Sequence, residues 1–197
     1  MVVYNPTIYQ GDTFTHVVRW EGTPIIYKPI TTITQAAPAV VTCPLHGVPD
    51  GWRVGVVSVL GMTQINAANS PLKDRDYVRS TLVDSNTIQL NTVNAAGYYA
   101  YKSGGYIQYN TPIDLTGFTA AMTIKDKVGG VALSTLTSAN GGLVIDIVAH
   151  TITIVITAVA SAAFTWTKGV YDLEVTSGAG VITGLLSGSV TVIPEIT

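Results

Sequence analysis

Apolar and polar residues alternate along most of the chain, and this period of two predicts β-strands. The alternating stretches at the two ends of the chain are residues 14–20, 120–124, 143–147, 152–156, 171–175 and 186–192. Glycine-rich segments, such as 141–142 and 177–180, separate several of them and suit tight hairpin turns. Six short strands with this spacing predict an antiparallel β-sandwich. Only residues 157–164 are expected to be helical, for a turn or two after a cap at Thr157.

The middle of the chain has a pattern of its own. Short strand candidates are residues 30–34, 39–42, 52–57, 77–78 and 87–90. Five short strands in so small a region predict a small β-barrel. The tripeptide Thr-Pro-Ile occurs at both borders of this region, at 23–25 and at 111–113. We therefore expect an all-β chain in which a barrel of residues 25–111 interrupts a sandwich made of residues 1–24 and 112–197.

Composition narrows the classes of function. Charged residues make up 11% of the chain, against about 25% in ordinary soluble proteins. Thr, Ser, Gly and Ala replace them, a composition typical of β-sheet surfaces that meet other proteins. The ten basic residues are scattered and the net charge is −2, so we expect no nucleic-acid partner.

The chain also lacks the patterns of membrane and secreted proteins. The longest apolar stretch, 143–156, contains Asp146 and His150 and is too short for a membrane helix. The first residues show no charged segment followed by an apolar one, so no signal peptide is expected. A single cysteine, Cys43, excludes an internal disulfide. These features predict folding in a reducing cytoplasm, without contact with a membrane.

The outer region carries four stretches typical of a known domain. They are GDTF at 11–14, PIDLTG at 112–117, GVYDLE at 169–174 and LLSGSVTV at 185–192. In these stretches and their order, the region resembles the N-terminal domain of the BppU family of phage baseplate proteins. The resemblance implies an immunoglobulin-like β-sandwich.

The inserted region resembles a different module, the FCCH-type β module first named in ubiquitin-activating enzymes and also found in phage particle proteins. The residues that carry this resemblance are ITQAAPAVVT at 33–42, HG at 46–47, GMTQIN at 61–66, Tyr77-Val78, DSNTI at 84–88 and YYAYKSGG at 98–105. One departure is a set of extra residues at 67–71. The match covers no catalytic-cysteine context, so it implies no ubiquitin chemistry.

Together, the two resemblances imply a structural protein of a tailed-phage particle, in the tail, baseplate or fibre-attachment region. The expected partners are copies of the chain itself, as a trimer or hexamer, and other virion proteins. The virion is then the expected location of the mature protein. Two alternatives stay open at this point: a module that binds a glycan on the host surface, and a capsid decoration protein.

Two groups of residues are candidates for an interaction surface. The first is a cluster of tyrosines near the end of the inserted region: Tyr98, Tyr99, Tyr101, Tyr106 and Tyr109. Flat rings with hydroxyls suit sugar or protein contacts, although the same residues could form the core of the barrel. The second group comprises Val155, Leu185 and Ile193, which alternate with expected core positions and would face outward.

No set of residues predicts an enzyme. Asp172 and Glu174 lie two apart on a strand, about 6–7 Å along its rise, which overlaps the carboxylate spacing of inverting glycosidases. They alternate with Tyr171 and Leu173, so solvent or a neighbouring subunit is the simpler environment. Asp74 and Asp76 alternate with Lys73 and Arg75, as in a solvated charge run.

The remaining candidates for metal binding or catalysis are few. Cys43 and His46 have a spacing found in metal sites, but a structural zinc needs about four ligands. His16 and His150 are the other two histidines, and both belong to the outer region. His16 alternates with Val18 and Trp20, as expected of a partly buried, hydrogen-bonded side chain. We therefore predict no catalytic residue, no metal and no cofactor.

Overall fold

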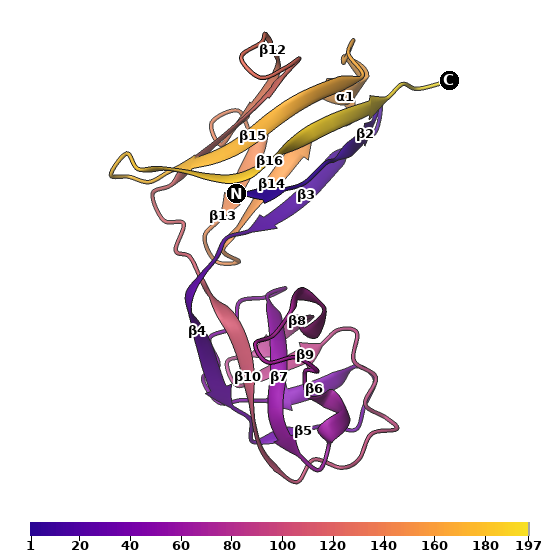
Figure 1. Cartoon of the computed structure of the whole chain (residues 1–197), viewed down its shortest axis with the longest axis vertical. Helices are drawn as coiled ribbons and strands as arrows, with labels where there is room; N and C mark the ends of the chain where they lie inside the picture. Colours follow the sequence, from indigo (N-terminus) through magenta and orange to yellow (C-terminus); the bar gives the residue numbers. More distant parts are fainter. Residues whose placement is uncertain (197) are drawn as a thin grey trace. The chain divides into compact units, whose positions relative to one another are not determined.

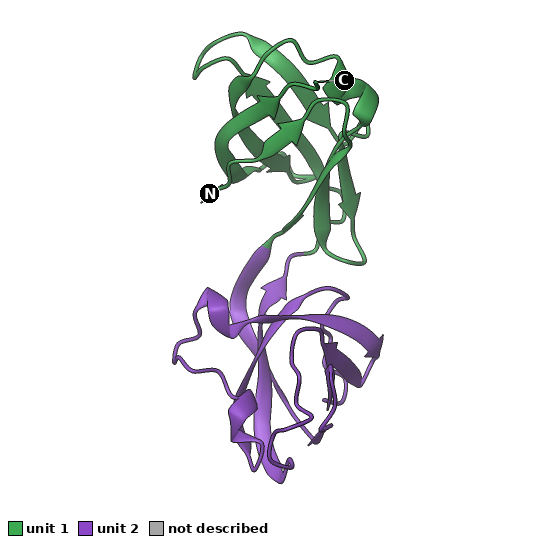
Figure 2. Cartoon of the chain, turned by 90° about the vertical axis from the view of Figure 1, so that its right-hand side faces the viewer, with its two compact units in different colours: residues 1–20, 114–197 green, residues 21–113 purple. Residues whose placement is uncertain are grey.

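The computed structural model describes residues 1–196 of the chain. It divides into two compact units (Figure 2), Met1–Trp20 with Asp114–Thr197 (unit 1) and Glu21–Ile113 (unit 2). The sequence placed the borders at 25 and 111. The structure extends unit 2 to Glu21 and Ile113 because β4 (Glu21–Pro29) and β10 (Ser103–Pro112) pair as far as Glu21 and Pro112. Both Thr-Pro-Ile segments thus belong to unit 2, where the Thr111 hydroxyl donates to the Pro24 carbonyl.

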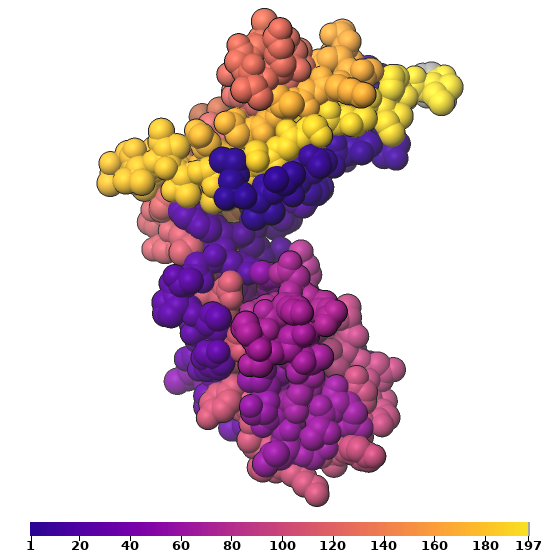
Figure 3. All heavy atoms as spheres, in the orientation of Figure 1, coloured from indigo at the N-terminus to yellow at the C-terminus, as the bar shows by residue number. Residues whose placement is uncertain are grey.

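The larger sheet of unit 1 has the order β1-β16-β15-β11-β12, and β2 also pairs with β16 (Figure 1). Its strands are β1 (Val2–Val3), β2 (Thr7–Tyr9), β11 (Thr119–Lys125), β12 (Ala132–Thr137), β15 (Lys168–Thr176) and β16 (Ile182–Ile193). The sequence predicted only antiparallel pairing. In the structure β1 and β2 run parallel to β16, and Figure 3 shows this N-terminal segment, in indigo, against the yellow C-terminal strand.

The smaller sheet of unit 1 has the order β13-β14-β3 and is antiparallel throughout. Its strands are β13 (Leu143–Asp146), β14 (Thr151–Ile156) and β3 (Phe14–Arg19). Alternate residues of both sheets are buried, among them Met122, Leu173 and Ile154. Since each sheet buries one face, the expectation of an all-β sandwich is confirmed.

The single α-helix of the described residues is α1 (Ala158–Ala162), where the sequence predicted one. The Thr157 side chain accepts a hydrogen bond from the Ala160 amide at 3.2 Å, as predicted for its cap. The Ser161 hydroxyl donates to the Asp12 carbonyl at 2.7 Å, which holds this helix to the segment before β3. No helix in residues 1–196 is long and apolar enough to cross a membrane.

Unit 2 is one seven-stranded sheet with the order β4-β10-β7-β8-β9-β6-β5. The strands not yet given are β5 (Thr32–Ile33), β6 (Ala39–Thr42), β7 (Arg53–Leu60), β8 (Val78–Asp84) and β9 (Thr87–Leu90). Two 3₁₀ turns, η1 (Thr63–Ile65) and η2 (Asp74–Asp76), lie between β7 and β8.

The sheet of unit 2 curls around a single core. Residues from both ends of the strand order, such as Ile33 of β5 and Ile107 of β10, belong to the same buried cluster, together with Trp52 and Met62. A barrel would also need β4 and β5 to pair. No such ladder forms in residues 1–196, so the predicted small β-barrel is corrected to a curled, open sheet. β4 and β5 are therefore the two edges of the sheet, although only residues 30–31 separate them in the chain.

Candidate functional site

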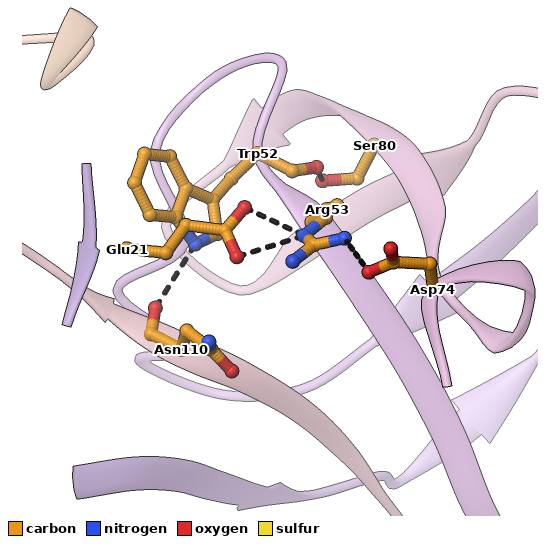
Figure 4. A network of polar contacts seen from close by, with 6 residues as sticks. All are labelled: Glu21, Trp52, Arg53, Asp74, Ser80 and Asn110. Atoms are coloured by element: carbon orange, nitrogen blue, oxygen red, sulfur yellow. Dashed lines mark hydrogen bonds and ion pairs between the residues drawn. The ribbon is translucent and has the colours of Figure 1, made fainter. Parts of the chain in front are cut away.

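An arginine at the start of β7 ties three parts of unit 2 together. Arg53 Nε donates to both carboxylate oxygens of Glu21, at 2.6 and 2.8 Å, and Nη1 donates to Asp74 Oδ1 at 2.9 Å (Figure 4). Its guanidinium carbon lies 4.8 Å from the centre of the Tyr77 ring. Burial alone would lower the pKa of Arg53, but the hydrogen bonds and charges of the two carboxylates outweigh it and raise that pKa. Arg53 thereby fixes η2 next to the first residue of β4.

Trp52, the residue before Arg53, bonds to the neighbouring strands β10 and β8 on the core side of the sheet. Trp52 is fully buried, and its indole Nε1 donates to the Asn110 carbonyl of β10 at 3.0 Å. The Ser80 hydroxyl of β8 donates to the Trp52 carbonyl at 2.9 Å (Figure 4). The middle of the sheet is thus held by side-chain bonds in addition to its ladders.

The segment of residues 66–76, the 66–76 loop, is held at both ends. At its start, the Asn66 side chain bonds to the amide and the carbonyl of Val59, at 2.8 and 3.0 Å, as a neighbouring strand would. At its end, the Asp76 carboxylate accepts from the amides of Lys73 and Ala68 and from Asn69 Nδ2. These hydrogen bonds, led by that of Lys73, lower the pKa of Asp76. Hydrogen bonds therefore hold the 66–76 loop in place at both of its ends.

This loop folds over the outer face of the sheet. The outer face is the one opposite to the core, and Gly55 and Gln108 lie on it, because Val54, Val56, Ile107 and Tyr109 alternate with them and are buried in the core. A Cβ atom at Gly55 would lie 2.0 Å from a Leu72 methyl group. Glycine is therefore required for the loop to approach β7 so closely.

Between the loop and the outer face lies a groove of about 580 Å³. It is lined by Ile25 and Tyr27 of β4, Val57 and Ser58 of β7, Gln108 of β10 and residues 67–72. Gln108 is only 4% exposed, although it lies on the face away from the core. The arrangement offers an amide, hydroxyls and an aromatic ring to a ligand, without a charged side chain in the lining.

The tyrosine cluster predicted from the sequence does not form one surface. Tyr109 is buried in the core of unit 2 and donates its hydroxyl to the His46 carbonyl, and burial raises its pKa to about 12. Tyr98 and Tyr101 are half-buried and pack against the same core. Only Tyr99, at 71%, and Tyr106, at 45%, are exposed. The alternation of β10 explains the split, since Tyr106 and Tyr109 lie on opposite faces of that strand.

The three apolar residues predicted to face outward also differ from one another. Ile193 is exposed and Val155 is half-buried. Leu185 is buried, at 8%, so its place in an interaction surface is wrong. The cause is a β-bulge: Leu173 pairs with Leu186 and Glu174 with Gly184, so Leu185 is an extra residue that breaks the alternation of β16.

Cys43 and His46 are both buried, and neither is arranged as a metal ligand. The Val48 amide donates to His46 Nδ1 at 2.9 Å, which leaves Nε2 to donate to the Asp84 carbonyl at 2.9 Å. Burial raises the pKa of the Cys43 thiol to about 11. Across residues 1–196, no three His, Cys, Asp or Glu side chains are grouped as a metal site would require. The ring of His16 stacks on Tyr4, with 4.0 Å between ring centres.

The two carboxylate pairs have different surroundings. Asp172 and Glu174 lie on the outward side of β15, opposite the buried Tyr171 and Leu173. Asp172 also lines a hollow of about 310 Å³ in unit 1, with Lys125 among the other residues that line it. The side chain of Asp74 is 93% exposed, as predicted for a solvated charge run, and it also bonds to Arg53. Asp76 is half-buried and bonds to other residues of the 66–76 loop.

Sequence reasoning missed the residues that line the groove. It treated Tyr106 and Tyr109 as surface candidates and gave no role to Gln108, which lies between them. Two signals were present in the sequence: Gln108 follows Tyr106 by two positions, and the extra residues at 67–71 depart from the module that the region resembles. The second of these signals lies in the 66–76 loop, which forms one wall of the groove.

Searches of protein-family models and of curated proteins find no match for this chain. The resemblances to the BppU and FCCH-type modules therefore stay predictions from short stretches of sequence.

Proposed function

We propose that the chain is a non-enzymatic structural subunit of a tailed-phage particle, an adaptor of the tail, baseplate or fibre-attachment region that assembles with copies of itself and with other virion proteins. The observation that carries this proposal is the interruption of one all-β unit by another. The stretches that resemble the BppU domain lie in unit 1, apart from Pro112 and Ile113, and those that resemble the FCCH-type module lie in unit 2. Each resemblance therefore coincides with one of the two compact units.

The surface of unit 1 supports a role in assembly. Large apolar side chains of unit 1 are exposed in its turns, on α1 and at the start of β16, namely Val128, Val131, Ile147, Val148, Val159, Val181 and Ile182. Charged residues make up only 11% of the whole chain. Apolar surface of this kind is covered in proteins that assemble. Within the proposed particle, copies of the chain and neighbouring virion proteins would cover it.

The test is to locate the chain in particles released by the strain that encodes it. Antibodies raised against the full chain, with gold labels, are expected to mark one end of the tail, and mass spectrometry of the purified particles is expected to detect the chain at a constant ratio to the major tail protein. Native mass spectrometry of the isolated chain should show a trimer or hexamer. A chain absent from purified particles, or labelling spread over the capsid, would contradict an adaptor role.

A further inference from the structure

Gln108 lines the groove of unit 2, and its amide atoms open onto it. Gln108 lies on the outer face of the sheet, where solvent normally hydrates side chains, and the 66–76 loop reduces its exposure to 4%. Its carboxamide makes no hydrogen bond to any residue that the structure describes. The amide provides two donors and one acceptor, and buried polar groups in proteins are almost always hydrogen-bonded. Neither amide atom of Gln108 is among the buried atoms that lack a partner, so both reach the solvent of the groove, where a ligand can replace water as their partner.

The neighbours of Gln108 define the chemistry of this ligand. Tyr27 lies directly opposite Gln108 in the β4–β10 ladder, so the two side chains share one face, and Tyr27 is 54% exposed. Ser58 and Ser70 add hydroxyls, and Leu72 adds an apolar contact. A ligand that suits this lining is neutral, carries groups that both donate and accept hydrogen bonds, and has an apolar face for a ring to cover. A pyranose sugar combines these three properties.

An extended peptide fits the same observations less well. It would pair with β4, which is the edge strand of the sheet, because an edge offers a row of free backbone groups. Binding there would not require the amide of Gln108, which lies one strand inward. A charged ligand would be left without a counter-charge in the lining.

We propose that the groove between the 66–76 loop and strands β4, β10 and β7 binds a neutral saccharide, with the Gln108 amide bonded to its hydroxyls and the Tyr27 ring against its apolar face. The groove is formed in advance, since Asn66 and Asp76 hold the loop and Leu72 rests on Gly55. This inference goes beyond the proposed role in a phage particle and does not depend on it. A chain absent from particles would refute the adaptor role and leave the groove's binding unaffected.

The test uses the full chain and a panel of neutral sugars at millimolar concentration: glucose, galactose, mannose, N-acetylglucosamine and their disaccharides. Proton–nitrogen correlation spectra report on the side-chain amide of Gln108, which is assigned by its absence in Gln108→Leu. We expect at least one sugar to shift this signal along a saturating curve. Gln108→Leu and Tyr27→Ala should each weaken binding by about tenfold or more.

Two controls make the result specific. Gln108→Leu replaces an unpartnered amide by an apolar group of similar size, so its melting temperature should not fall. Tyr99→Ala removes an exposed tyrosine of the same unit that does not line the groove, and it should bind the sugar as the unchanged chain does. The proposal is overturned if no sugar of the panel shifts Gln108, or if Gln108→Leu and Tyr27→Ala bind as tightly as the unchanged chain. It is also overturned if neutral peptides, and not sugars, shift the signals of β4.

Discussion

Unit 1 and unit 2 are both built from strands, but they enclose their cores in different ways. In unit 1, two sheets each bury one face, and alternate apolar residues of long strands fill the space between them. In unit 2, a single sheet must curl around its core, and buried polar side chains help to hold it. His46, Ser80 and Trp52 each bond to backbone that lies far away in the sequence.

The difference follows from how each unit encloses its core. Two facing sheets cover one another, so alternation along the strands is sufficient to shield the apolar residues. A single sheet covers its core only if its strands curl and its loops close the open side, and Met62, which directly precedes η1, is buried in that core. The loops of unit 2 are therefore part of its fold, and one of them also forms the wall of the groove.

The largest expected effect comes from removing one unit. If residues 21–113 are deleted and Trp20 is joined to Asp114 through a short Gly-Ser linker, unit 1 should still fold, because its core contains residues of unit 1 only. Dispersed amide signals and a cooperative thermal transition are the measurements. A deletion variant without a cooperative transition would show that unit 1 needs unit 2 to fold.

The second prediction compares one core substitution in each unit. Trp52→Ala should destabilise unit 2 by about 3–5 kcal/mol, and Leu173→Ala should destabilise unit 1 by about 2–5 kcal/mol, because each leaves a cavity at a fully buried site. Urea unfolding followed by residue-specific amide signals measures the two units separately. Each variant should shift the signals of its own unit, and equal shifts in both units would mean that they unfold as one.

The sequence predicted best those strands that bury one face and expose the other. The alternation at 120–124 and 171–175 located β11 and β15, because a strand with one buried face shows a period of two. β4 was not predicted, since Pro24 and Pro29 argue against a strand and are tolerated here only because β4 lies at an edge. β12 was not predicted either, because its two leucines, Leu133 and Leu136, do not alternate.

The candidate site was less accessible to sequence reasoning than the fold. The burial of Gln108 comes from a loop that is distant in sequence, and no local pattern encodes that contact. The same limit explains Leu185, whose burial results from a bulge that is set by the pairing of β15 with β16. The partners of Arg53, in β4 and η2, were likewise not evident from its surroundings in the sequence.

The third prediction concerns the hydrogen bonds that Arg53 donates to Glu21 and Asp74. Arg53→Met keeps most of the side-chain volume but leaves the largely buried Glu21 carboxylate without its partner. We expect unit 2 to lose about 1–2 kcal/mol of stability, with unit 1 unchanged. Arg75→Met is the matched control, since Arg75 is exposed, donates one long hydrogen bond of 3.4 Å to Asn69 and acts on Asp76 through its charge, without bonding to Glu21 or Asp74. Equal losses in the two variants would contradict a specific role for the Arg53 network.

The smallest effect on stability is expected from lowering the pH. It distinguishes the carboxylate of Asp76, which holds the 66–76 loop, from that of Asp114, which bonds only within its own turn. Hydrogen bonds lower the pKa of Asp76 in unit 2, chiefly that of the Lys73 amide, and the pKa of Asp114 in unit 1, chiefly that of the Thr116 hydroxyl. Because each folded pKa lies below its unfolded value, the stabilisation is complete above the unfolded pKa. It is lost as the pH falls through the folded pKa, below about pH 4.

The amide signals of Lys73 and Thr116 should report these two titrations, each at a pH below that of an unperturbed aspartate. Asp76→Asn should abolish the first and also shift the signals of Val59 and Gln108, because the 66–76 loop covers the groove. Asp114→Asn should abolish the second and change only residues near 114–116, where its bonds to Thr116 are confined. If Asp76→Asn leaves Val59 and Gln108 unaffected, the carboxylate does not hold the loop, and the wall of the groove depends on Leu72 and Asn66 instead.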